Sequence, residues 1–74
     1  MNNLFNADKL EIFSEPLIGV VEEAIAPQQP GRISFQGSYW PAKLYQSNSP
    51  IILSPEKAVK VVGIQGITLL VQPF

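Results

Sequence analysis

Residues 32–44 read RISFQGSYWPAKL, and this stretch predicts a β-hairpin. Two runs rich in β-branched and aromatic residues flank Gln36-Gly37, which is typical of a tight two-residue turn. With these two residues as the loop, Ile33 pairs with Trp40, and cross-strand partners share one face of a sheet. The residues on the face of Ile33 are Phe35, Trp40, Ala42 and Leu44, and those on the opposite face are Arg32, Ser34, Tyr39, Pro41 and Lys43. One face of the hairpin is therefore expected in a hydrophobic core and the other in solvent.

Further short strands are expected on both sides of this hairpin. The five expected strands cover residues 18–26, 32–36, 38–45, 58–65 and 67–72. The sequence PQQPG at 27–31 ends the first strand, with Gly31 allowing the chain to turn, and Gly66 separates the last two strands. Short strands divided by turn residues predict an all-β fold, and closure into a small barrel leaves the least exposed edge.

The second hairpin does not fit a strict alternation of inward and outward residues. A two-residue turn at Gln65-Gly66 would pair the inward Val61 with Leu70. However, Thr68 and Gln72 are polar and expected in water, which makes Leu69 and Val71 the better core residues. A β-bulge at Gly63 would shift the phase by one residue and remove this conflict. The sequence therefore predicts a bulge in the fourth strand.

A polar loop is expected between the two hairpins. It is interrupted by the apolar residues 51–53, which are expected to close one end of the barrel. Ser54-Pro55 resembles the start of a helix, with serine as N-cap and proline in the first turn. At most one helical turn fits before Val59.

Residues 1–16 lack the β-rich pattern of the rest of the chain. The expected division is therefore an N-terminal tail over 1–16 and a barrel over 17–74. Asn6 could cap a short helix that continues to Phe13, although Lys9 stands where a capping box needs Glu or Gln. A short helix and a disordered tail both remain open for this segment.

Composition limits the fold and excludes several kinds of site. The chain has 74 residues, 46% of them hydrophobic, so one small folded domain is expected. It contains no cysteine and no histidine, which excludes disulfides, thiolate metal sites and the most common general bases. The formal net charge of −1 gives no bulk attraction to nucleic acid or anionic lipid. No apolar run approaches the ~20 residues of a membrane-spanning helix, and a signal peptide is not evident, so a cytoplasmic domain is expected.

Three segments together resemble a known family. They are Pro30-Gly31-Arg32-Ile33 with Gly37-Ser38-Tyr39-Trp40-Pro41-Ala42, then Val59-Lys60-Val61-Val62-Gly63-Ile64-Gln65-Gly66, and finally Leu69-Leu70-Val71-Gln72-Pro73. Their order and spacing match a pattern of two parts. The first part is, in order, a glycine, a hydrophobic residue, a second glycine, a tryptophan or tyrosine, and an alanine. After a gap, the second part has alternating valines, a glycine and a closing Leu-x-Val-x-Pro. Over residues 17–73 the chain resembles the C-terminal domain of the NfeD family. It departs from the pattern at Glu56, where the family usually has glycine, and in the position of the proline before Gly31.

The resemblance implies an OB-type, five-stranded Greek-key barrel, which agrees with the strand pattern. In that family the domain usually follows membrane segments, sometimes with a serine-protease domain of the ClpP class ahead of it. Such proteins are thought to work beside stomatin- and flotillin-like membrane scaffolds. The resemblance therefore implies a domain that docks on such a protein, is associated with membrane complexes through it, and needs no cofactor.

No catalytic constellation is evident in the sequence. Ser54 and Lys57 match the Ser-x-x-Lys spelling of some acyl-transfer enzymes, but a helix cap with a solvated lysine explains them better. Glu22 and Glu23 are adjacent, so on a strand they face opposite ways and cannot act as an acid–base pair. We therefore expect no enzymatic site and no metal site.

Partner-binding candidates lie on the outward face of the second and third strands. Arg32, Tyr39 and Lys43 combine cations with a flat ring there, and Tyr45 follows them. OB barrels bind single strands and sugars on this face, whereas the simpler interpretation is a solvated sheet face or a protein contact. Trp40 points inward by the alternation and is expected in the core.

The leading hypothesis for function is a non-catalytic protein-interaction module. The alternative is single-stranded nucleic-acid binding through Arg32, Tyr39 and Lys43, and a third possibility is a purely structural unit of an oligomer. The low net charge favours a protein partner over nucleic acid.

Overall fold

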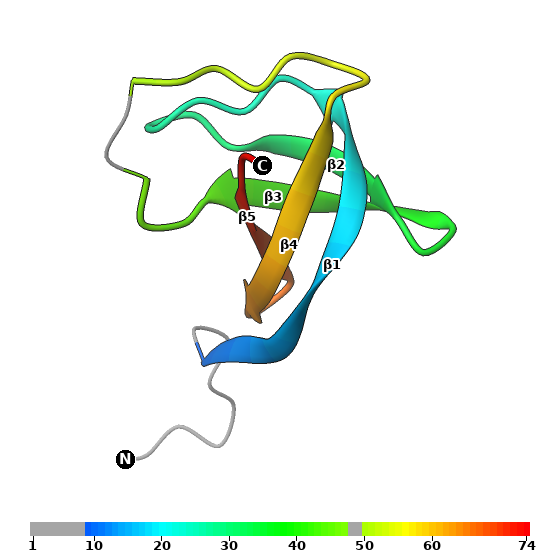
Figure 1. Cartoon of the computed structure of the whole chain (residues 1–74), viewed down its shortest axis with the longest axis vertical. Helices are drawn as coiled ribbons and strands as arrows, with labels where there is room; N and C mark the ends of the chain where they lie inside the picture. The colour runs from blue at the N-terminus through cyan, green and yellow to red at the C-terminus, as the bar shows by residue number, and fades with distance from the viewer. Residues whose placement is uncertain (1–8, 48–49) are drawn as a thin grey trace.

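The computed structural model describes residues 9–47 and 50–74, and in them the chain forms five β-strands. The strands are β1 (Leu10–Glu23), β2 (Gly31–Phe35), β3 (Ser38–Leu44), β4 (Ala58–Gln65) and β5 (Thr68–Gln72). They close into one barrel in the order β1-β2-β3-β5-β4, with β4 again beside β1 (Figure 1). All neighbouring pairs are antiparallel except β3 and β5, which run parallel. The expected all-β, five-stranded barrel of the OB type is confirmed.

The hairpin of β2 and β3 has the register that the sequence predicts. Ile33 lies opposite Trp40 and Ser34 opposite Tyr39. Gln36 and Gly37 both have positive φ, 52° and 83°, which is the backbone of a type I′ turn. The twist of that turn matches the twist of the strands, so the two loop residues fix the register of the whole hairpin.

The second hairpin contains the expected bulge. The pairing of β4 with β5 passes from Val61↔Val71 directly to Gly63↔Leu70, so Val62 is the extra residue on β4. A Cβ on Gly63 would lie only 2.4 Å from the carbonyl oxygen of Glu11, so glycine lets β1 approach β4 closely here. Gly31 has a similar role: its φ is not positive, and a Cβ there would lie 2.2 Å from the carbonyl oxygen of Glu23. Close packing, rather than the turn that the sequence suggested, requires this glycine.

The expectation of a helix or disorder is wrong for residues 10–16, because they form the first half of β1. Leu10 to Ile12 pair with Gln65 to Gly63, and the pairing resumes at Leu17↔Val61 after an irregularity. The backbone of this segment pairs with β4, which is distant in sequence, and a local helix signal carries no information about such long-range pairing. The proposed cap at Asn6 lies outside the described residues. β1 also ends earlier than expected, at Glu23, and residues 25 and 26 form isolated bridges instead.

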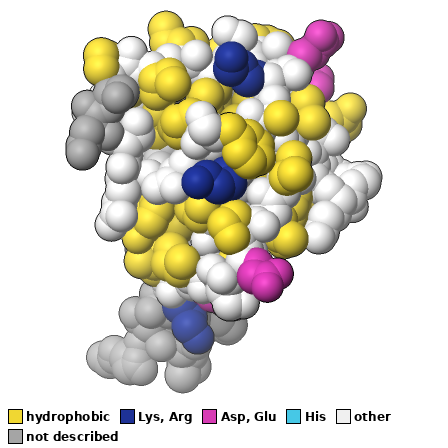
Figure 2. All heavy atoms as spheres, viewed as in Figure 1, with side chains coloured by type: hydrophobic (Ala, Val, Ile, Leu, Met, Phe, Trp, Pro, Cys, Tyr) yellow, Lys and Arg dark blue, Asp and Glu magenta, His cyan; other side chains and the backbone are white. Residues whose placement is uncertain are grey.

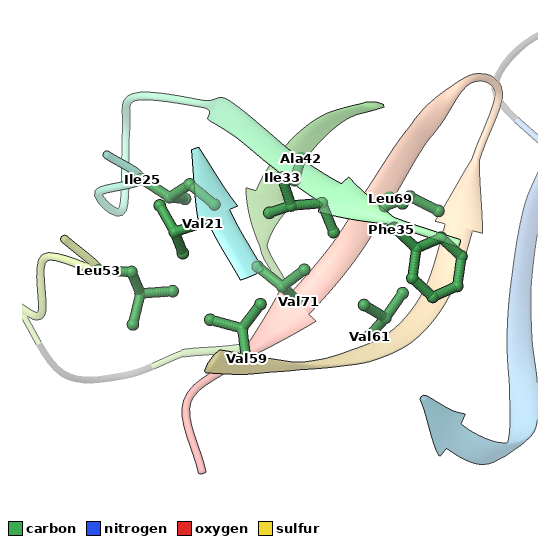
Figure 3. Packing of buried hydrophobic residues seen from close by; sticks show 10 residues of the cluster. All are labelled: Val21, Ile25, Ile33, Phe35, Ala42, Leu53, Val59, Val61, Leu69 and Val71. Atoms are coloured by element: carbon green, nitrogen blue, oxygen red, sulfur yellow. The ribbon is translucent and has the colours of Figure 1, made fainter. Parts of the chain in front are cut away.

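The barrel encloses one hydrophobic core (Figure 3). Its buried members are Val21, Ile25, Ile33, Phe35, Ala42, Leu53, Val59, Val61, Leu69 and Val71. In Figure 3, Leu53 lies with Ile25 and Val21 toward one end of the cluster, and Phe35 lies toward the other. Trp40 is only partly buried and packs against this cluster from its border. The expected core position of Trp40 is therefore a half-buried one.

The segment before β4 closes one end of the barrel as expected, but without a helix. Leu53 is fully buried and exchanges two backbone hydrogen bonds with Ile25, at 2.8 and 3.1 Å, whereas its neighbour Ile52 is 65% exposed. Ser54 accepts a hydrogen bond from the backbone N–H of Lys57 in a tight turn in which Glu56 has φ of 74°. This positive φ is incompatible with the helical turn that Ser54-Pro55 suggested. No helix in the described residues has the length and hydrophobicity to cross a membrane.

Candidate partner-binding surface

The structure places three of the four candidate residues on one face of the barrel. Arg32 lies opposite Pro41, and Tyr39 and Lys43 stand two residues to either side of Pro41 on β3. Residues two apart on a strand share a face, so Arg32, Tyr39 and Lys43 are close neighbours on the outer surface. Tyr45 follows the end of β3 and is half-buried; its backbone N–H donates to Val71 O and its carbonyl accepts from Gln72 Nε2, both at 3.0 Å. The backbone of Tyr45 thus continues the contact between β3 and β5.

Arg32 is held by a neighbouring carboxylate. Its Nη2 donates to Glu23 Oε2 at 2.6 Å, and this is the one ion pair found within residues 9–47 and 50–74. The hydrogen bond to Glu23, and then the charge of that carboxylate, raise the pKa of the Arg32 guanidinium. Both side chains remain about half exposed, so the pair is a solvated one. Since Glu23 neutralises the cation, this face offers less positive charge to a nucleic-acid backbone than the sequence suggested.

Tyr39 shares its face of the barrel with two exposed apolar residues of β1 that were not among the predicted candidates, and Ser34 on β2 lies between them. Tyr39 is 64% exposed, and two outward side chains of β1, Ile18 at 66% and Val20 at 42%, are exposed as well. The register connects them, because Tyr39 lies opposite Ser34 on β2 and Ser34 lies opposite Val20 on β1. Ile18 is two residues from Val20 on the same strand and therefore on the same face. We call Ile18, Val20 and Tyr39 the outer apolar patch.

A signal for this patch was present in the sequence. Residues 17–21 are all apolar or glycine, whereas a strand with one face in water usually alternates with polar residues. In the structure Gly19 and Val21 are buried, and Ile18 and Val20 face outward. The unbroken run could have indicated a strand that is apolar on both faces, and thus a surface available to a partner.

Charged side chains border the outer apolar patch. Lys60 on β4 is half-buried and lies opposite Ile18, and the Arg32–Glu23 pair lies one row beyond Val20 and Ser34. Figure 2 shows the side of the molecule on which β1 and β4 lie in front, where hydrophobic side chains lie next to a few basic ones. An apolar centre with a charged rim is the usual composition of a protein–protein contact.

The described residues offer no grouping suited to catalysis or metal binding. They contain no cluster of three or more acidic side chains that could hold a metal ion. Ser54 and Lys57 are both exposed, and neither stands on a helix, so the buried helical setting that a catalytic Ser-x-x-Lys needs is not found at this position. Within the same residues, no buried polar side-chain atom lacks a hydrogen-bond partner. The surface can offer apolar contact area and a few charges, which suits binding.

Comparison with known proteins gives the family. The model of the NfeD-like C-terminal, partner-binding domain matches residues 14–73. Among solved structures, the chain is similar to the C-terminal domain of stomatin operon partner protein 1510-C from Pyrococcus horikoshii, at 32% identity and a TM-score of 0.63. That similarity covers 77% of this chain and 81% of the other. No curated protein matches the chain. Because the family model spans most of the sequence and the barrel agrees with a solved member, this chain belongs to the family of NfeD-like C-terminal, partner-binding domains.

Proposed function

We propose that this domain is a non-catalytic docking module that binds a stomatin-like membrane scaffold protein through the outer apolar patch. The patch supplies the centre of the contact, and Arg32, Lys43, Lys60 and the nearby Tyr45 supply its border. In this proposal the domain works in the cytoplasm and reaches membrane complexes through its partner.

The exposure of Ile18, Val20 and Tyr39 together is the observation that carries the proposal. Scattered exposed apolar residues are normal on a soluble domain, but a group connected by the register across three strands favours a partner surface. Tyrosine is among the residues that dominate binding energy in protein contacts, because it brings a large rigid ring and a polar tip. Membership in a partner-binding family and similarity to a stomatin operon partner protein support the kind of partner.

The proposal is tested by calorimetric titration of the 74-residue chain with a purified stomatin-like protein, with a flotillin-like protein in a second series. Tyr39→Ala and Ile18→Ser should each weaken binding at least about tenfold, as expected for residues at the centre of a contact. Ile67→Ser is the matched control, since Ile67 is 72% exposed but lies in the β4–β5 turn. It should leave the affinity unchanged.

Two outcomes would contradict the proposal. Binding that Ile67→Ser weakens as strongly as Tyr39→Ala would move the contact away from the outer apolar patch. The absence of binding to either scaffold, with the chain folded by circular dichroism, would remove the proposed class of partner. Tyr39 and Ile18 are exposed, so both variants are expected to fold.

A further inference from the structure

The N-terminal half of β1 has one edge that no described strand pairs. On the side of β4, β1 is paired from Leu10 to Ile12 and again from Leu17 to Val20, with an irregularity between, whereas on the side of β2 the pairing covers only Val20 to Glu23. Over residues 10–18 the second edge of β1 therefore presents unused backbone N–H and C=O groups among the residues that the structure describes. In Figure 1 this half of β1 curves past the end of the barrel at which β4 ends. A free edge of this kind can pair with another strand.

The edge belongs to a segment that the barrel holds in place. Phe13 is half-buried and packs against the hydrophobic core, and the carbonyl of Lys9 accepts a hydrogen bond from Gly66 N at 3.3 Å. On the opposite face of the strand, Leu10 is 47% exposed and Ile12 is 49% exposed. The segment is thus a preformed strand with apolar side chains on its free surface, which lowers the entropic cost of pairing.

Symmetry restricts how two copies of this edge can pair. In an antiparallel pair related by a two-fold axis perpendicular to the sheet, one residue must lie opposite its own copy, because paired residues share a face. Centring on Glu11 places two carboxylates together, and centring on Phe13 places Glu11 opposite Glu15. Centring on Ile12 instead places Lys9 opposite Glu15, twice by symmetry, with no pair of like charges.

The remaining registers bring less of the strand into contact or less favourable partners. Centring on Leu10 pairs only residues 9–11 of those described. Centring on Ser14 places Ile12 opposite Pro16, which has no N–H to donate. The register centred on Ile12 pairs residues 9–15 and ends before Pro16. It is the one in which both the charges and the exposed apolar residues fit.

We propose that two copies of this chain associate through antiparallel pairing of residues 9–15 of β1, centred on Ile12, so that one sheet continues from barrel to barrel. Ile12 lies beside its own copy at the axis, and Leu10 flanks it. The contact does not include Ile18, Val20 or Tyr39, so this association is independent of the docking proposed above.

The first test uses a cysteine scan, which is clean because the chain has no cysteine. Cα atoms of directly opposed residues lie about 4.5–5.5 Å apart, within the range that a disulfide spans. Ile12→Cys should therefore form a cross-linked dimer under mild oxidation. Leu10→Cys is the matched control: in this register each Leu10 lies about 13 Å from its copy, so it should cross-link at least tenfold more slowly.

The second test uses charge exchange and sedimentation over a range of concentrations. The full chain should show a monomer–dimer equilibrium. Lys9→Glu and Glu15→Lys should each weaken the dimer about tenfold, and the double exchange should restore it. A chain that stays monomeric up to millimolar concentration would overturn the proposal. A dimer in which Leu10→Cys cross-links as fast as Ile12→Cys, or in which the double exchange fails to restore association, would overturn this register.

Discussion

Glu56 occupies a backbone conformation that suits glycine better. Its φ is 74°, and its N–H donates to the carbonyl of Val21 at 2.7 Å, so the turn before β4 is tied to β1 through this residue. A side chain in the left-handed region costs roughly 1–2 kcal/mol. The NfeD pattern usually has glycine here, and the positive φ gives a physical reason for that preference.

We therefore expect Glu56→Gly to stabilise the domain by about 0.5–1 kcal/mol, the relief of strain being partly offset by the greater freedom of glycine in the unfolded chain. Urea unfolding measured by circular dichroism would show this as a higher midpoint. Lys57→Gly is the control, because Lys57 is exposed and its φ is not positive. It should lower stability by roughly 0.5 kcal/mol, and a midpoint that falls in both variants would contradict the expected strain.

At the scale of elements, the two ends of β1 are held by different strands. Its C-terminal end pairs with β2, while its N-terminal half depends on β4 and on the space left by Gly63. The two halves of β1 can therefore lose their order separately. Local opening of a barrel strand is expected where pairing exists on one side only.

Gly63→Ala should detach the N-terminal half of β1. The added Cβ would lie 2.4 Å from Glu11 O and 3.0 Å from Ile12 Cδ1, and overpacking of this kind costs roughly 1–3 kcal/mol. Amide hydrogen exchange followed by NMR should show lost protection at residues 10–12 with the rest of the barrel intact. Gly37→Ala adds a Cβ that has no atom within 4 Å apart from its chain neighbours, so it should leave the protection of residues 10–12 unchanged even though its φ of 83° makes the turn strained. Unchanged protection in Gly63→Ala would show that β1 can yield without detaching.

At the scale of the whole molecule, the barrel depends on one core without disulfides. A 74-residue domain at ~0.05–0.15 kcal/mol per residue has about 4–11 kcal/mol of stability in total. The buried Leu53, supplied by the segment between β3 and β4, joins the core from outside the named strands. A cavity left by truncating Leu53 would therefore remove a large fraction of the total free energy of unfolding.

Leu53→Ala should cost about 2–5 kcal/mol and bring the domain close to unfolding at room temperature. Ile52→Ala changes a neighbour of the same size in the same segment, but Ile52 is 65% exposed, so it should cost less than about 1 kcal/mol. Thermal unfolding of both variants gives the comparison. Equal losses of stability would contradict the closure of the barrel by Leu53.

Sequence reasoning predicted those features that depend on neighbouring residues. Gln36-Gly37 sets the hairpin because its two positive φ angles act on the adjacent strands, and the alternation around it decides which residues face inward. The bulge at Val62 and Gly63 followed from the same alternation, because only an extra residue places both Val61 and Val71 in the core. The absence of histidine and cysteine excluded the commonest catalytic chemistry in the same direct way.

The tertiary structure alone decided the features that join distant segments. The strand at residues 10–16, the pairing of Arg32 with Glu23, and the alignment of Val20 with Tyr39 across β2 all depend on which strands lie side by side. Local sequence carries no signal for these, because the hydrogen bonds and contacts are made by residues far apart along the chain. The candidate surface was thus predicted at Arg32, Tyr39 and Lys43, on the hairpin that local rules define. The apolar run at residues 17–21 could have pointed to Ile18 and Val20, but only the closure of the barrel, which brought β1 beside β2, placed them on one face with Tyr39.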